Sequence, residues 1–318
     1  MSESNPSEPV RLLTPKQARR AWVMALVGLT IYCGVVWVLG WRDVRDELLS
    51  AQFSLVFYSA LIIVSATWLR AVKWRYALGK DSHAFSLYFL SKATGNWTPG
   101  RVGEFAPMAL RNHRTPRVGA WILFDRIIEI IATLALGLYG LAMITLVSDE
   151  QFWLVAAAIV VATAAGIYVL TRRQWFLAWA DKCTDGSIFH KIFMLLAAVS
   201  VEFHRFGKSL PITGSITIFT KVVDLWAIVL MFKALGHSPS LALMAAAKCA
   251  LAIVSFFPIT PTSTFIPHGT QAWIMNQSAG IEKEVLAAGI GIEVLVVSVT
   301  FWLSFAIALP GIKKAASS

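Results

Sequence analysis

The sequence predicts an all-α polytopic membrane protein, with about six full spans plus two re-entrant helical hairpins in an inverted-repeat arrangement. The first observation behind this prediction is composition: 57% of the 318 residues are hydrophobic and 14% are charged, whereas soluble domains carry about 25% charged residues. The second is that apolar stretches of roughly 20 residues, enough to cross a hydrocarbon core of about 30 Å, recur along the chain. The third is the distribution of Lys and Arg between these stretches.

The apolar stretches place the full spans. The first follows a polar segment and lacks a small-residue cleavage site, so it is not expected to be a signal peptide. The predicted spans are residues 22–39, 53–69, 118–147, 152–170, 211–235 and 285–309. They form a single transmembrane domain, residues 21–310, between a polar N-terminal tail of residues 1–20 and a C-terminal tail of residues 311–318.

The basic residues orient these spans. Lys and Arg crowd into residues 11–20, 70–117, 172–208 and 313–314, while the opposite loops hold fewer of them beside several Asp and Glu. By the positive-inside rule, both tails are predicted to be cytoplasmic. Cytoplasmic loops that face anionic lipid headgroups then explain the net charge of +10, and no nucleic-acid partner is expected.

Residues 83–117 must begin and end in the cytoplasm, because basic residues follow the span 53–69 and precede the span 118–147. The stretch "AFSLYFLSKATGNW" within them is apolar but too short to cross a bilayer. A re-entrant hairpin is predicted, with "NWTPGRVGEF" at its tip and with Pro99, Gly100 and Gly103 in the turn. The alternative is an ordinary cytoplasmic loop after a short interfacial helix.

The region between the last two predicted spans repeats this arrangement from the other side of the membrane. Its apolar stretch is broken by polar residues and by prolines, among them Pro258 and Pro261. Residues 21–170 and 190–310 are therefore predicted to be inverted halves. Irregular backbone at membrane depth must be buried in protein or line a wet cavity, so two such hairpins predict a site near the midplane.

Charged residues in the spans and hairpins are the candidate site. Arg126 lies about eight residues into its span, roughly 12 Å deep, and Glu293 reaches a similar depth from the opposite side. A charge at the centre of a spanning helix costs about 2.5–3.5 kcal/mol, so such residues tend to be functional. The predicted substrate-binding residues are Arg101, Glu104, Asp125, Arg126, Glu129, Lys221, Asp224, His268 and Glu293.

These charges also have a structural interpretation. Arg126 with Glu129, and Lys221 with Asp224, are spaced three residues apart and could be ion pairs that only join helices. Lys248 is interpreted as an interfacial residue. The small residues of "GLYGLAMIT" and "GIGIE" are expected to allow close helix packing.

Catalytic signatures are not found in the sequence. It contains no HExxH helix, no GxSxG elbow and no Cys/His spacing that fits a metal. The three cysteines are far apart and indicate no disulfide framework. We therefore expect no catalytic residue, no metal and no cofactor, and we do not expect an enzyme.

The segment "GNWTPGRVGEFAPMALRNHRTPRVGAWILFDRIIEIIA" resembles the characteristic segment of the flippase-like, lysylphosphatidylglycerol-synthase transmembrane-region family. That family has a proline-glycine-x-x-glycine-glutamate turn, here Pro99 to Glu104, followed by a span that contains an arginine, here Arg126. The similarity extends over about residues 22–309. The family's second motif is altered: Thr262 and Ser263 stand in "PITPTSTFIPHGTQ" where it has glycines, and the expected glutamate is missing.

The resemblance implies a stand-alone membrane domain, without a synthase domain, in the bacterial cytoplasmic (inner) membrane. It would move lipids with a polar, phosphate-bearing headgroup between leaflets, and the expected ligands are phospholipids, glycolipids or polyprenyl-phosphate lipids. Arg101, Arg126 and Lys221 would neutralise the phosphate, while the carboxylates would hold these cations or carry a coupling proton. The alternatives are a non-transporting scaffold of a glycosyltransferase or lipid-modifying enzyme, and a buried intramembrane enzyme.

Overall fold

The computed structural model describes residues 30, 33–34, 36–38, 40–79, 83–96, 99–109, 116–144, 148–185, 187–256 and 265–317. The regular elements in these ranges are all helices, which confirms the predicted all-α class. In chain order they are α2 (Trp41–Ser50), α3 (Phe53–Leu78), α4 (Ala84–Asn96), the 3₁₀ helix η1 (Pro99–Ala109), α5 (Pro116–Met143), α6 (Asp149–Thr171), α7 (Arg173–Ala180), α8 (Ile188–Gly207), α9 (Leu210–Ala234), α10 (Leu241–Phe256), α11 (Phe265–Ala279) and α12 (Lys283–Ser317).

Three helices of the described chain are long and apolar enough to cross a membrane. They are α3, α9 and α12, over Phe53–Leu78, Leu210–Ala234 and Lys283–Lys314. Helices α3 and α12 contain the predicted spans 53–69 and 285–309, and α9 covers all but the last residue of the span 211–235. Helices α5 and α6 cover most of the predicted spans 118–147 and 152–170. Most of the predicted first span, residues 22–39, lies outside the described residues.

Helix α3 does not end where the sequence predicts. It continues past Leu69 to Leu78, where Gly79 stops it with a φ of 95° and donates its N–H to the carbonyl of Arg75, a conformation that glycine adopts without strain. The prediction took the first basic residues as the edge of the membrane. The helix extends nine residues past that point, and Arg70 and Lys73 are turned into the protein, with Lys73 fully buried.

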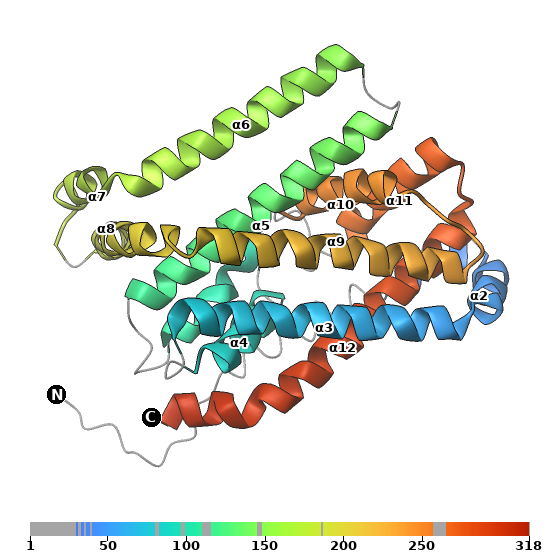
Figure 1. The fold of residues 1–318 in the computed structure, drawn as a ribbon, viewed down its shortest axis with the longest axis horizontal. Coiled ribbons are helices and arrows are strands. Elements are labelled where there is room, and N and C mark those ends of the chain that lie inside the picture. Colours follow the sequence, from blue (N-terminus) through green and yellow to red (C-terminus); the bar gives the residue numbers. More distant parts are fainter. Residues whose placement is uncertain are drawn as a thin grey trace.

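The helices lie roughly along one direction (Figure 1). Helices α3 and α9 pack side by side and antiparallel through the middle of the molecule, and α10 packs between α5 and α11. Helix α2 lies across one end, against the start of α12. Helix α6 stands apart from the rest and makes its main contacts with α5 and α8.

The contacts between helices follow a repeat. If α3, α4, η1 and α5 are exchanged with α9, α10, α11 and α12, each contacting pair becomes another contacting pair. The contact of α4 with η1 becomes that of α10 with α11, and the contact of α5 with α10 becomes that of α12 with α4. The pair α3 and α9 maps onto itself. The two four-element units therefore have equivalent internal and mutual contacts.

Glycines permit the closest of these contacts, as the sequence predicts. A Cβ added at Gly140 of α5 would lie 2.4 Å from the Ala242 carbonyl oxygen of α10, and one at Gly137 would lie 2.3 Å from Cys249. On α12, a Cβ at Gly289 would lie 2.5 Å from the ring of Phe232. The small residues thus let the helix backbones approach one another.

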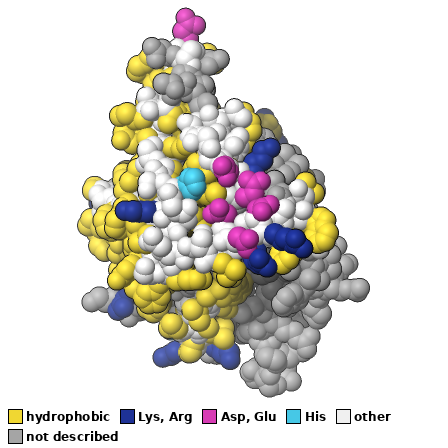
Figure 2. Space-filling view, turned by 90° about the vertical axis from the view of Figure 1, so that its right-hand side faces the viewer, with side chains coloured by type: hydrophobic (Ala, Val, Ile, Leu, Met, Phe, Trp, Pro, Cys, Tyr) yellow, Lys and Arg dark blue, Asp and Glu magenta, His cyan; other side chains and the backbone are white. Residues whose placement is uncertain are grey.

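The two ends of the molecule differ in charge. Acidic side chains gather at the end formed by α2 and the start of α12 (Figure 2); they are Asp43, Asp46, Glu47, Glu282 and Glu284. The opposite end exposes basic side chains at the ends of several helices; they are Arg75, Arg117, Arg172, Arg173, Lys208, Lys313 and Lys314. Between the two ends, large apolar side chains are widely exposed.

Candidate functional site

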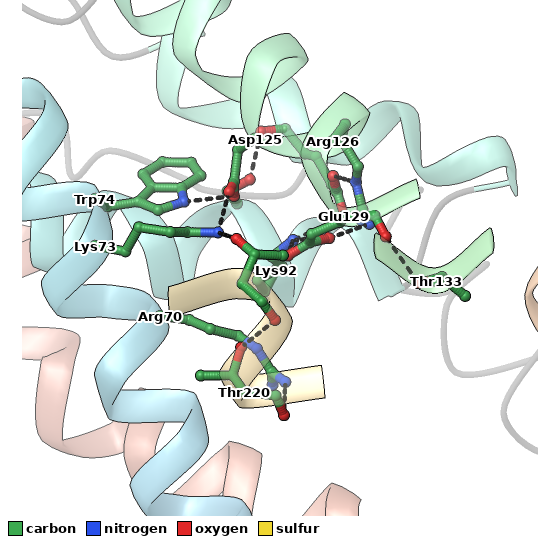
Figure 3. Close-up of polar contacts among 12 residues, drawn as sticks. Arg70, Lys73, Trp74, Lys92, Asp125, Arg126, Glu129, Thr133 and Thr220 are labelled. Carbon is green, nitrogen blue, oxygen red and sulfur yellow. Dashed lines mark hydrogen bonds and ion pairs between the residues drawn. The ribbon is translucent and has the colours of Figure 1, made fainter. Parts of the chain in front are cut away.

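Charged side chains from α3, α4, η1, α5 and α9 meet inside the first four-element unit and its contact with α9 (Figure 3). We call them the first charged cluster. It consists of Arg70, Lys73, Lys92, Glu104, Asp125, Arg126, Glu129, Lys221 and Asp224. All but three of these residues were predicted from the sequence; Arg70, Lys73 and Lys92 were missed.

Arg126 lies at the centre of the cluster. It is ten residues beyond the start of α5 at Pro116, or roughly 15 Å along the helix. Its Nη1 donates to Glu129 Oε2 at 2.7 Å, and its guanidinium also pairs with Glu104. Lys92 Nζ lies 3.3 Å from Glu129 Oε2 and 3.9 Å from Glu104 Oε1. The predicted Arg126–Glu129 ion pair is confirmed, and η1 brings Glu104 to the same guanidinium.

Helix α4 fixes the position of Glu104. The Ser91 hydroxyl donates to the Glu104 carbonyl at 2.8 Å, and the Thr94 hydroxyl donates to the Gly103 carbonyl. Gly95 leaves room for the Glu104 side chain, since a Cβ there would lie 2.4 Å from Glu104 Cγ. The two hydroxyl groups therefore bind η1 to α4, and the absence of a side chain at Gly95 lets the two elements pack closely.

Asp125 belongs to the most buried part of the cluster. It forms an ion pair with Lys73, and their side chains are 2% and 0% exposed. Trp74 Nε1 donates to Asp125 Oδ2 at 2.8 Å, and Lys73 Nζ donates to the Thr217 hydroxyl of α9 at 2.9 Å. Because both charges are paired and hydrogen-bonded, this part of the cluster joins α3, α5 and α9 rigidly.

Asp224 is held by a different cation from the one that the sequence suggested. It pairs with Arg70 of α3, which also donates to the Thr220 carbonyl at 3.2 Å. The cation paired with Asp224 therefore comes from a neighbouring helix. Lys221 instead lies near enough to Glu129 to act on it electrostatically.

The cations of the first charged cluster are only partly shielded from solvent. The side chains of Arg126, Lys92 and Arg70 are 18%, 13% and 15% exposed, and that of Asp224 is 28% exposed. Lys73 is the exception, with none of its side chain exposed. A ligand that approached between the helices could therefore reach the guanidinium and ammonium groups without unfolding the bundle.

A second, smaller set of polar residues lies in the other unit. We call Lys248, His268, Gln271 and Glu293 the second charged cluster. Lys248 Nζ pairs with Glu293 and donates to Gln271 Oε1 at 3.0 Å, while Gln271 Nε2 donates to Glu293 Oε2 at 3.2 Å. The interfacial interpretation of Lys248 was wrong, because α10 turns this side chain inward to Glu293, a residue 5% exposed.

The two clusters occupy equivalent places in the repeat. Lys92 and Lys248 lie on α4 and α10, while Glu129 and Glu293 lie on α5 and α12. Glu104 of η1 corresponds in place to Gln271 of α11, and each contacts the Lys of its own cluster. Glu293 is ten residues beyond the start of α12 at Lys283, roughly 15 Å along it. Because α5 and α12 start at opposite ends, both clusters lie at middle depth.

The structure describes the remaining predicted residues less completely. Pro99 begins η1, which also contains Gly100, Arg101 and Gly103, so the predicted turn is a 3₁₀ helix; the Arg101 side chain lies outside the described part of the structure. Pro258 and Pro261 also lie outside it. His268 is half-buried on α11 and acts electrostatically on Glu293.

Comparison with known proteins identifies one family. The model of a family described as the lysylphosphatidylglycerol synthase TM region matches residues 25–308. Those residues include every charged residue of both clusters and all of the helices that carry them except the last part of α12. Neither a search of curated proteins nor a search of solved structures finds a match.

Proposed function

The chain belongs to the lysylphosphatidylglycerol synthase TM region family, and from that premise we propose that it moves a lipid with a phosphate-bearing headgroup between leaflets. The family and the apolar helices make it an integral membrane protein with a lipid-related role. The proposed activity makes and breaks no covalent bond. It needs only a place where a charged headgroup is stable at membrane depth.

The observation that carries the proposal is the partly exposed first charged cluster within otherwise apolar helices. Charges at the centre of a spanning helix cost about 2.5–3.5 kcal/mol each and mark ligand pathways when they face a polar space. Arg126 is reachable and presents a planar fork, which suits the two oxygens of a phosphate. The headgroup would exchange with Glu104 or Glu129 for this fork, while the lipid tails stay in the bilayer.

We also propose the topology on which the activity depends. The basic end of the molecule would face the cytoplasm and the acidic end the outside, with both termini cytoplasmic, in a bacterial inner membrane. Elements α4 with η1, and α10 with α11, would be re-entrant hairpins in inverted halves. The equivalence of their contacts and the equivalent places of Lys92 on α4 and Lys248 on α10 support this arrangement.

A scaffold for a lipid-modifying enzyme is the second candidate. It is favoured by the pairing within the clusters, because Asp125 and Glu293 already have cations bound to them. Paired charges can join helices without binding any ligand. The two candidates differ in what happens when Arg126 loses its charge.

The test is leaflet exchange in liposomes of purified protein, with labelled phosphodiester lipids and a phosphate-free glycolipid for comparison. We expect the phosphodiester lipids alone to exchange. Arg126→Gln should abolish exchange while folded protein remains, because the amide cannot neutralise a phosphate. Arg205→Gln is the matched control: Arg205 also pairs with a glutamate three residues away, but its side chain is 72% exposed on α8.

Two outcomes would contradict the proposal. One is a wild-type protein that exchanges no lipid. The other is an Arg126→Gln protein that fails to fold and is restored, with its exchange activity, when Glu129 is also changed to Gln. In that case Arg126 serves to balance a buried carboxylate, as a scaffold requires.

A further inference from the structure

The two charged clusters hold different balances of charge. The first has five cations and four carboxylates among its described members, a formal charge of +1. The second has Lys248 and Glu293 as its ion pair, a formal charge of zero when His268 is neutral. The equivalent places therefore carry different side chains. The second cluster has Gln271 where the first has Glu104. Three residues before its glutamate, the second cluster has Ile290 where the first has Arg126.

Within the described residues, Lys248 is the cation bonded to Glu293, and His268 acts on it electrostatically. Lys248 is the ammonium bound to it, and the other contact is the neutral amide of Gln271 at 3.2 Å. Glu129, by contrast, is contacted by both Lys92 and Arg126. If a ligand took one cation away, Glu129 would keep another bonded cation, whereas Glu293 would lose the ammonium bonded to it and keep the amide of Gln271, with the titratable His268 nearby.

We infer that Glu293 binds one proton whenever Lys248 leaves it for the phosphate of a lipid headgroup, so that the second charged cluster takes up a phosphodiester anion together with a proton. This inference rests on the proposed function and names its coupling ion. Before uptake the cluster contains an ammonium and a carboxylate. Afterwards it contains the ammonium, the phosphodiester and a neutral carboxylic acid, so its net charge is unchanged.

The physical reason is the cost of an unpaired buried charge. An isolated carboxylate moved away from water is unstable enough that it takes up a proton instead. The first charged cluster, with its additional cation, can accept one negative charge and become neutral without any proton. Proton uptake is therefore expected at the second cluster alone, toward the end of the molecule where α10 and α12 begin.

Two other titratable groups, Lys248 and His268, lie near Glu293. Lys248 faces it from α10 and His268 from α11. The bonds to Glu293 come from Lys248 of α10 and Gln271 of α11. His268 is thus the rival titratable group, and Gln271 cannot titrate. The experiment must separate Glu293 from His268.

The experiment uses the full-length protein in liposomes that contain a pH-sensitive dye, with the membrane potential clamped. An ether-linked short-chain phosphodiester lipid is added outside, and its arrival in the inner leaflet is recorded together with the internal pH. We expect about one proton per lipid, because one negative charge must be compensated. The readout is the proton-to-lipid ratio: whatever lipid exchange Glu293→Gln retains should carry no proton, since the amide mimics the protonated acid.

Three further variants sharpen the result. Glu282→Gln, an exposed acid just before α12, should keep the wild-type proton-to-lipid ratio. His268→Gln should keep it as well. Lys248→Met should lose exchange, because the anion has no cation at the second cluster. The inference is overturned if Glu293→Gln still moves about one proton per lipid, or if His268→Gln rather than Glu293→Gln loses the proton.

A second measurement separates this inference from the proposed function. Infrared difference spectra on adding the same lipid to protein in detergent detect new protonated carboxyl groups without any transport. The wild-type protein should show the carboxylic acid band, and Glu293→Gln should lack it. A wild-type protein that exchanges no lipid but gains this band refutes translocation and leaves Glu293 as a proton site; absence of the band refutes the proton site itself.

Discussion

Gly95→Ala should destabilise the protein through Glu104, not through α4. The new Cβ would lie 2.4 Å from Glu104 Cγ and 3.2 Å from its Cδ, far inside van der Waals contact, so Glu104 must move. Overpacking of this kind costs about 1–3 kcal/mol. If Glu104 also leaves Arg126, a buried ion pair is broken, which costs about 3–5 kcal/mol when one charge is left without its partner.

The assay is a double-mutant cycle with Glu104→Gln, measured as the free energy of unfolding in mixed detergent micelles. Glutamine has the same shape as glutamate, so the clash remains, but its ion pair with Arg126 is already absent. Gly95→Ala should therefore cost less in the Glu104→Gln background than in the wild type, by at least about 1 kcal/mol.

Gly166→Ala on α6 is the matched control for this cycle. Nothing lies within 4 Å of the Cβ that it would add, so the substitution should stabilise by roughly 0.5–1 kcal/mol through helix propensity. Equal costs of Gly95→Ala in both backgrounds would show that the added methyl group does not disturb the ion pair between Glu104 and Arg126. Wild-type stability of Gly95→Ala would refute the contact altogether.

Three other predictions concern the fold. Lys73→Met should lower the free energy of unfolding by about 3–5 kcal/mol, because Asp125 is left buried without its cation. The double variant Lys73→Met with Asp125→Asn should recover most of this loss. A Lys73→Met protein with unchanged stability would contradict the pairing. Gly140→Ala should lower the free energy of unfolding by about 1–3 kcal/mol, measured in the same micelles. The added Cβ would lie 2.4 Å from the backbone of α10, which cannot move away as a flexible side chain can. A cysteine at Lys208 should be labelled from the cytoplasm and one at Asp46 from outside; the reverse pattern would invert the proposed topology.

The sequence predicts the helices and most of the first charged cluster well. Hydropathy indicates where the helices lie, because the bilayer requires long apolar stretches. Glu104, Asp125, Arg126 and Glu129 were recognised because charged residues inside such stretches are costly and therefore unusual. Arg126 and Glu129 could even be paired, since residues three apart share a face of one helix.

The cations that complete both clusters could not be predicted in the same way. Arg70 and Lys73 follow the end of an apolar stretch, where Lys and Arg usually mark the membrane surface, and Lys248 is a lone cation within another stretch. Their carboxylate partners lie on other helices, and Asp224 is 154 residues from Arg70. Until the packing of α3 on α9 is known, the charge pattern of the sequence does not distinguish a surface residue from a buried one.

Gly95 shows a second reason why part of the site could not be predicted from the sequence. In the sequence it is one small residue before the turn, and the motif directs attention to Gly100 and Gly103. Its importance comes from the Glu104 side chain of the neighbouring element, which lies close to the face where a Cβ would be. A contact between two elements is visible only after both have been placed.

The pairing of Arg70 with Asp224 also constrains the order in which the protein is made. Helix α3 leaves the ribosome early, and α9 carries the partner of Arg70 154 residues later. Trp74, one turn further along α3, receives its own partner, Asp125, after only 51 residues. Until α9 is synthesised, Arg70 has to remain with water or headgroups, because alone it is unstable in hydrocarbon. Helix α3 can therefore reach its final depth only late in biogenesis, when the second half of the chain arrives.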